Sequence, residues 1–182
     1  SYDTIGVNYS DLRKPDARIE TVISNALGSA ETVLNVGAGT GSYEPAGRTV
    51  TAIEPSAEMI RQRTAQAAPV IQGYAENLPF DDSSFDASMA VLTVHHWTDK
   101  EKGLKEMRRV TRGPVVVLTY DPAFRAFWLL DYFPELVALD EAQMPGIPDY
   151  ERWLGPVEIS PVPIPHDCTD RFLSAYWRRP SA

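Results

Sequence analysis

Three glycines at alternate positions, Gly37, Gly39 and Gly41, directly follow the short β-branched and apolar run 32–36. A second apolar run ends on the carboxylate of Glu54, 17 positions after the first glycine. Glycines let a backbone approach a bulky ligand because they carry no Cβ, and a carboxylate at about this distance along the chain meets a ribose diol. In a parallel α/β sheet both segments end at the edge that binds ligands. The pattern predicts a site for a cofactor that contains a nucleoside.

The spacing of the glycines separates two classes of cofactor. Dinucleotide folds carry Gly-x-Gly-x-x-Gly, whereas here the third glycine comes one residue early and Ser42 takes the sixth position. A nicotinamide-dependent oxidoreductase is therefore disfavoured. Three such glycines alone also fit an ordinary tight turn between a strand and a helix. The interpretation as a cofactor site therefore depends on further motifs.

Three further segments follow the glycines in a fixed order. They are 73–86, which begins Gly-Tyr-Ala-Glu-Asn-Leu-Pro-Phe; 90–97, which ends in His-His-Trp; and 106–119, a helical stretch followed by three valines. Together these motifs resemble the class I S-adenosylmethionine (SAM) methyltransferases, in particular the ubiquinone/menaquinone-biosynthesis type (methyltransferase type 11). The resemblance covers 33–119. It implies a Rossmann-like fold, SAM as cofactor, and methyl transfer to a small organic molecule.

The resemblance also implies roles for individual residues. The backbone at the glycines would contact the methionine part of SAM, Glu54 the ribose hydroxyls, and Met59 the adenine, whose polar edge Ala75 and Glu76 would hold. The residues expected to bind the cofactor are Gly37, Ala38, Gly39, Thr40, Gly41, Glu54, Pro55, Met59, Ala75, Glu76 and Leu92.

Two positions depart from the family pattern. Asn35 stands where an acid is usual, which weakens the negative charge near the sulfonium. Tyr74 stands where an aspartate usually accepts a hydrogen bond from the adenine amino group. We expect SAM to bind, but more weakly than is typical of the family.

Methyl transfer from a sulfonium needs few catalytic groups, because alignment of the two reactants supplies much of the rate. His95 and His96 follow the fourth predicted strand at the ligand edge, and histidine titrates near neutral pH. We name His96 as the candidate general base. The alternative is a purely structural turn with Trp97 buried, which the variety of substrates in the family favours. Candidate substrate-binding residues are Tyr9, Arg13, His95, Phe124 and Trp128.

The elements that position these residues follow from periodicity and from helix-capping residues. Apolar residues at helical spacing predict a helix from Asp16 that ends at Gly28. Further helices are expected over 56–66, capped by Ser56, over 98–110, capped by Thr98, and after residue 169, over 172–177. Strands are expected over 32–36, 49–53, 70–72, 85–92 and 115–119, with 157–164 limited to an edge by its prolines.

The predicted fold is α/β, a Rossmann-like doubly wound and mostly parallel sheet. Residues 1–182 are predicted to form one domain, with an N-terminal arm over 1–14 and a helical substrate lid over 121–156. The aromatic residues of that lid would line the acceptor pocket or simply cover the sheet. The family sheet has seven strands and ends in an antiparallel pair, but only six candidates are present, so the C-terminal pair is expected to be incomplete.

The connection between the first two strands is unusually short. Only 12 residues, Gly37–Arg48, join them, and Pro45 and Gly47 lie within this stretch. A parallel crossover needs about a dozen residues and usually contains a helix. We therefore expect the first crossover helix to be reduced to one turn or lost, and the cofactor site to be more open on this side.

Composition narrows the classes of function. A formal net charge of −8 argues against nucleic acid as a partner, and the basic residues of 100–112 alternate with acids, as on a solvated helix face. The segment after the fourth strand lacks the Asn/Asp-Pro-Pro-Tyr-like turn of amino-methylating enzymes. No apolar run reaches the length of a membrane span, and the first residues show no leader.

The lone Cys168 suits a reducing cytoplasm and excludes a cysteine-based metal site. We expect no metal, a small-molecule acceptor, no nucleic-acid or membrane partner, and a cytoplasmic monomer or homodimer. The open alternative is a non-catalytic SAM-binding or partner-binding protein that retains the fold.

Overall fold

The computed structural model describes residues 14–125, 128–164 and 167–170. Its centre is a parallel sheet with the strand order β3-β2-β1-β4-β5. The strands are β1 (Thr32–Val36), β2 (Thr49–Glu54), β3 (Val70–Gln72), β4 (Ala87–Val91) and β5 (Val115–Leu118). This order places the topological switch point between β1 and β4, where doubly wound sheets bind ligands beyond the carboxyl ends of the strands. The predicted fold class is confirmed.

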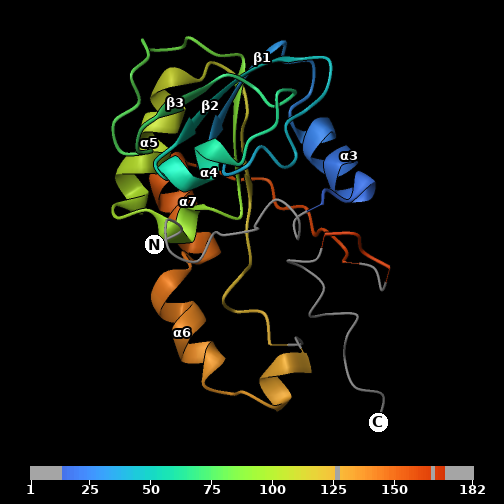
Figure 1. Ribbon diagram of the computed structural model, residues 1–182. Helices are drawn as coiled ribbons and strands as arrows, with labels where there is room; N and C mark the ends of the chain where they lie inside the picture. The colour runs from blue at the N-terminus through green and yellow to red at the C-terminus, as the bar shows by residue number, and fades with distance from the viewer. Residues whose placement is uncertain (1–13, 126–127, 165–166, 171–182) are drawn as a thin grey trace.

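Helices cover both faces of the sheet (Figure 1). Helix α3 lies on one face, while α5 and α7 pack together on the other. The helical elements are α3 (Ala17–Ala26), α4 (Ala57–Arg61), α5 (Lys100–Val110), α6 (Leu136–Gln143) and α7 (Ile147–Leu154), with short 3-10 turns η1 (Val94–His96) and η2 (Trp128–Asp131). Two apolar clusters match these layers. One joins α3 to Val33 and Met89, and the other joins α5 and α7 to Leu34 and Ile53.

The first helix forms where its capping residues predict. Asp16 caps α3 by accepting a hydrogen bond from Arg18 N at 3.0 Å. Gly28 follows the helix with φ of +60°, the left-handed conformation that favours glycine. Ile19 and Ile23 then face the sheet, at 1% and 4% exposure.

Two helix boundaries differ from the sequence prediction. The cap of α5 is Asp99, one residue after the expected Thr98, and its Oδ1 accepts from Lys102 N at 2.9 Å. Helix α4 starts at the expected cap, Ser56, but ends at Arg61 instead of continuing to residue 66. Two residues beyond the helix, the Arg63 side chain turns inward, to contacts described below.

The crossover from β1 to β2 contains no helix, as its length predicts. It is held instead by side chains, and the most buried of these is Tyr43, at 2% exposure. Its hydroxyl donates to Asp170 Oδ2 at 2.8 Å and accepts from the backbone N–H of Asp16 at 3.2 Å. The crossover is thus fastened to the start of α3 and to a segment near the end of the chain.

The predicted edge strand over 157–164 is wrong, because these residues pair with no strand. Pro161 and Pro163 lack the N–H groups that a ladder needs. Val162 and Ile164 pack instead against the apolar cluster on the α3 side. No strand follows β5 within the described ranges, so the sheet there has five strands rather than six. The N-terminal arm up to residue 13 and the helix expected over 172–177 lie outside the described residues.

The segment 121–156 is largely helical, with η2, α6 and α7. Its aromatic residues divide into two groups. Tyr150 of α7 is 5% exposed and belongs to the core cluster under α5, which fits the interpretation that these rings cover the sheet. Phe124, Tyr132 and Phe133 are at least half exposed. The lid role of this segment stays a prediction.

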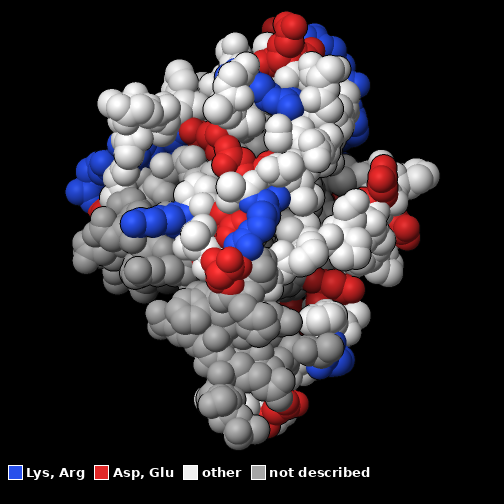
Figure 2. Space-filling view, turned by 90° about the vertical axis from the view of Figure 1, so that its right-hand side faces the viewer, with Lys and Arg blue, Asp and Glu red and all other residues white. Residues whose placement is uncertain are grey.

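The surface is mixed in charge. Figure 2 shows basic and acidic side chains interspersed over the side of the molecule that carries α3. Of the helices in the described part of the chain, none is long and apolar enough to cross a membrane.

Candidate functional site

A cavity opens where the carboxyl ends of the strands meet, with about 890 Å³ of empty space when its mouth is included. It lies at the switch point between β1 and β4 that the topology predicts. The lining residues are Asn35, Gly37–Thr40, Ser42, Glu54, Pro55, Met59, Gly73–Glu76, Val91–Thr93 and His96–Thr98. The lining thus comes from the carboxyl ends of the four strands β1 to β4.

Gly37 is the position where the cavity wall has no room for a side chain. Its φ is +69°, and a Cβ there would overlap the side chain of Thr93. Its N–H donates to the carbonyl of Ile53 at 2.9 Å, which fixes the first turn of the glycine loop against β2. The bare backbone is therefore held at the cavity edge.

Glu54 holds the glycine loop and the start of α4 with one carboxylate. It is 6% exposed, and its Oε2 accepts from Gly39 N at 2.7 Å while Oε1 accepts from Ser56 N at 2.9 Å. A carboxylate only accepts hydrogen bonds, and ribose hydroxyls can donate them, so its chemistry suits a ribose. Its role as ribose ligand stays a prediction, and its loop-fixing role is an addition that the spacing alone did not indicate.

The far end of the cavity is mostly apolar. Met59 and Ala75 are 2% and 4% exposed, which suits contact with a flat ring such as adenine. Glu76 lies beside them, but its Oε1 accepts from the backbone N–H of Asp99 at 3.0 Å. Tyr74, the departure from the family pattern, is 66% exposed at the rim.

The two histidines occupy the turn η1, with ring centres 3.8 Å apart. His96 lines the cavity and His95 does not. Burial, the neighbouring imidazole and Lys100 lower the pKa of His95 to about 4. Burial and Lys100 also lower the pKa of His96 from its ordinary value. Both rings are therefore neutral at pH 7, and a neutral ring can accept a proton.

The structure brings together most of the residues expected at the cofactor site. Ten of the eleven lie in the cavity lining, and the exception is Gly41. Among the substrate candidates, Phe124 is 61% exposed, Tyr9 and Arg13 lie outside the described residues, and the structure does not describe the Trp128 side chain. Sequence reasoning missed Thr93 and Trp97 as lining residues. Thr93 lies two residues after the end of β4, a position that could have indicated it, whereas Trp97 directly follows the turn η1.

Sequence reasoning also missed a buried ion pair beside the loop. Arg63 and Glu44 have side chains 4% and 9% exposed, with Arg63 Nη2 2.6 Å from Glu44 Oε1. Arg63 Nη1 also donates to the carbonyl of Gly39 at 3.0 Å, and Asn35 Nδ2 donates to Glu44 Oε1 at 3.3 Å. No local sequence pattern predicts this pairing, because the two residues lie in different connections.

Comparison with known proteins assigns this arrangement to a family. The model of the methyltransferase domain family matches residues 34–118. The ubiquinone/menaquinone biosynthesis C-methyltransferase UbiE of Citrifermentans bemidjiense is 31% identical over 139 residues, which cover 60% of this chain and 57% of that protein. The solved structure titled "Putative methyltransferase from antibiotic biosynthesis pathway", from Anabaena variabilis, is 37% identical with a TM-score of 0.78, over 92% of this chain and 73% of that one.

A SAM-dependent methyltransferase structure from Thermotoga maritima is 26% identical with a TM-score of 0.58, over 74% of this chain and 66% of that one. The chain belongs to the methyltransferase domain family. The family and these neighbours imply S-adenosylmethionine as the methyl donor. The chain spans about half the length of the curated relatives it matches.

The residues present fit that cofactor. A backbone surface without side chains at Gly37, the buried carboxylate of Glu54 and the apolar floor at Met59 suit a methionine chain, a ribose and a purine in that order. Within the described residues, no group of three or more His, Cys, Asp or Glu side chains could hold a metal ion.

Proposed function

We propose that this chain is a SAM-dependent methyltransferase that acts on a small organic molecule. The observation that carries the proposal is the cavity at the switch point. At its edge Gly37 leaves no room for a side chain, and Glu54 fixes the loop beside it. The named function of the Citrifermentans relative, in quinone biosynthesis, supports a small acceptor.

The chemistry divides between the cofactor and the chain. Bound SAM supplies a methyl group on a sulfonium, which an acceptor atom attacks in line. The chain's own residues hold the two reactants in alignment, an effect that supplies about 7–11 kcal/mol in well-oriented reactions. His96 lies in the cavity wall with its pKa lowered, so it is neutral at pH 7 and can take the proton that an acceptor hydroxyl, thiol or amine releases.

The first experiment is a set of calorimetric titrations of the purified chain with SAM, S-adenosylhomocysteine and NAD. We expect micromolar binding of the two adenosyl compounds and none of NAD. Binding of NAD alone would instead indicate an oxidoreductase, and the absence of all binding would refute the proposal.

A second function is favoured by two observations, the neutral Asn35 at the end of β1 and the missing crossover helix. Both would fit a SAM-binding protein that has lost catalysis. A screen of small phenols, quinols, amines and thiols with methyl-labelled SAM separates the two functions. Labelled product from any of them establishes the enzyme, whereas saturable SAM binding without product favours the non-catalytic protein.

A further inference from the structure

The ion pair of Arg63 and Glu44 is poorly explained by stability alone. Burying two charges has a desolvation cost that their attraction often fails to exceed. Arg63 also leaves its Nε buried with no partner among the described residues. An apolar pair of similar volume would often serve the fold as well or better. The pair contacts two residues that line the neighbouring cofactor cavity, which suggests a role there.

The first contact fixes the glycine loop. Arg63 Nη1 donates to Gly39 O at 3.0 Å, and Glu54 Oε2 accepts from Gly39 N at 2.7 Å. Two charged side chains therefore hold the peptide groups on either side of one cavity-lining residue. Hydrogen bonds to charged groups are about twice as strong as neutral ones. These side chains hold the loop in addition to the backbone hydrogen bond from Gly37 to Ile53.

The second contact fixes the orientation of Asn35. This residue lines the cavity at 2% exposure, and its Nδ2 donates to Glu44 Oε1 at 3.3 Å. A carboxylate only accepts, so the amide nitrogen must face Glu44. The amide is planar, so its oxygen is directed away from Glu44, and no described residue donates to that Oδ1. An acceptor with partial negative charge is thus kept free at the cavity wall.

Glu44 is itself held in place from both sides. Its Oε1 takes the Arg63 guanidinium, and its Oε2 accepts from Ala68 N at 2.8 Å. Gly41 makes room for this arrangement. With φ of +94°, a Cβ there would lie 3.1 Å from Glu44 Oε2 and 3.4 Å from Arg63 Nη1. The third glycine of the motif therefore faces the ion pair, which accounts for its absence from the cavity lining.

We propose that the buried Arg63–Glu44 pair is a positioning device for the cofactor. It fixes the Gly39 carbonyl and turns the Asn35 amide so that its oxygen receives the ammonium group of the methionine moiety. Arg63 and Glu44 are positioning residues, since neither lines the cavity. The inference rests on the proposed function, because it requires an adenosyl amino acid in this cavity.

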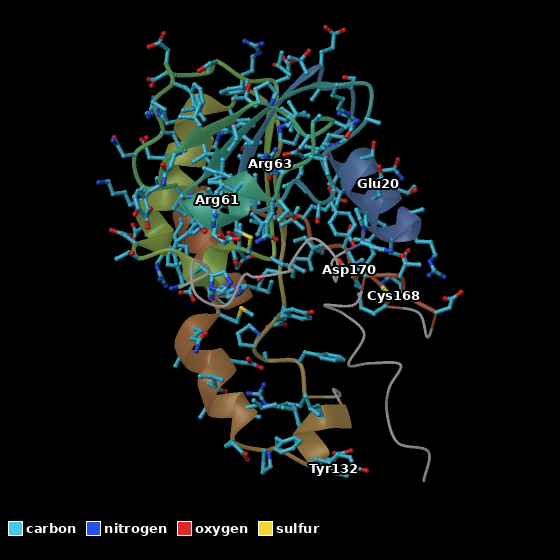
Figure 3. The ribbon with its side chains drawn as sticks, viewed as in Figure 1. Glu20, Arg61, Arg63, Tyr132, Cys168 and Asp170 are labelled. Atoms are coloured by element: carbon cyan, nitrogen blue, oxygen red, sulfur yellow. The ribbon has the colours of Figure 1, made fainter. Side chains whose placement is uncertain are left out.

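The test compares two ligands that differ in the amino-acid moiety. S-adenosylhomocysteine carries the ammonium group, whereas 5′-methylthioadenosine has the same nucleoside and sulfur without it. The main variant is Arg63→Met with Glu44→Leu, which removes both charges together. The control is Arg61→Met, on an exposed arginine that pairs with Glu58; Figure 3 labels it on α4, with Arg63 just beyond it. Affinities come from calorimetry and folding from thermal unfolding.

We expect the double variant to unfold near the wild-type temperature and to lose about ten- to hundredfold in affinity for S-adenosylhomocysteine, the fold-change of one hydrogen bond to a charged group. Its affinity for 5′-methylthioadenosine should change by about twofold at most. The control should match the wild type with both ligands. Unchanged affinities in the double variant, or equal losses for both ligands, would overturn the inference.

Asn35→Ala keeps the inference testable if the double variant fails to fold. This variant removes the proposed acceptor and leaves the ion pair in place. It should show the same selective loss for S-adenosylhomocysteine, and an unchanged ratio of the two affinities would overturn the inference. A wild-type chain that binds neither ligand would refute the proposed function instead, so the two failures are distinguishable.

Discussion

Tyr43 and Glu44 are neighbours in the sequence, and they fasten the helix-free crossover to two different parts of the fold. Tyr43 reaches Asp16 and Asp170, while Glu44 reaches Arg63 on the loop that follows α4. Two adjacent side chains thus attach a crossover that contains no helix to the rest of the fold. The loop that they hold carries the glycines of the cofactor cavity.

The Tyr43 hydroxyl should be needed for stability. Tyr43→Phe removes a donor to the fully buried carboxylate of Asp170, so we expect a loss of about 1–3 kcal/mol in the free energy of unfolding. Urea denaturation measures it. The matched control is Tyr74→Phe, on a tyrosine that is 66% exposed, and it should stay within about 0.5 kcal/mol of the wild type. Equal effects at both positions would contradict the anchoring role.

Gly37 should tolerate no side chain. Gly37→Ala adds a left-handed strain of about 1–2 kcal/mol and also a collision with the Thr93 side chain. Gly47→Ala is the matched control, because its φ of +77° imposes a similar strain while its Cβ would meet nothing within 4 Å. We expect the first variant to lose clearly more stability in chemical denaturation than the second, and S-adenosylhomocysteine binding as well. Equal losses would show that Thr93 yields without cost.

Restoring the family's usual acid at position 35 should not improve cofactor binding or stability in this chain. In Asn35→Asp, two carboxylates would face each other where Asn35 Nδ2 now donates to Glu44, and like charges at this range disfavour ionisation. We expect weaker S-adenosylhomocysteine binding and a lower unfolding temperature. Tighter binding by Asn35→Asp would contradict the assigned orientation of the amide.

The acid limb of activity should lie below pH 6.5 if His96 is the base. Its pKa is lowered by burial and by Lys100, so its neutral form persists to lower pH than that of an ordinary histidine. Lys100→Gln should move the acid limb of kcat/KM upward, since kcat/KM reports groups of the free enzyme. Lys105→Gln, on a lysine paired with Glu101, should leave it in place. A wild-type limb at or above pH 6.5 would remove His96 from this role.

The lowered pKa of His95 predicts that the stability of the protein depends on pH. Its folded pKa of about 4 lies below the ordinary 6.5, so the unfolded chain binds more protons between these values. Stability should therefore fall as pH drops from about 6.5 to about 4, and His95→Gln should weaken that dependence in thermal unfolding. An unchanged pH dependence would mean that other groups set it.

The sequence predicted what depends on local pattern. Short apolar runs predicted the five strands, and the spacing from Gly37 to Glu54 placed both residues at one cavity. The 12 residues of the crossover predicted that its helix would be reduced to one turn or lost, and no helix forms there. The prediction failed where side chains from distant segments decide the outcome. Helix α4 ends early, just before Arg63 turns inward to Glu44, and the prolines of 157–164 leave that segment unpaired.

The hydrogen bond from Tyr43 to Asp170 also determines when the crossover becomes fixed during synthesis of the chain. These residues lie 127 positions apart, and a chain emerges from the ribosome from its N-terminus, with local structure forming first. Strands β1 to β5 can pair while the later residues are still being added. The crossover receives its last anchor only when residue 170 has emerged. The glycine loop is thus synthesised well before its last anchor and is fully fastened only when that anchor has been added.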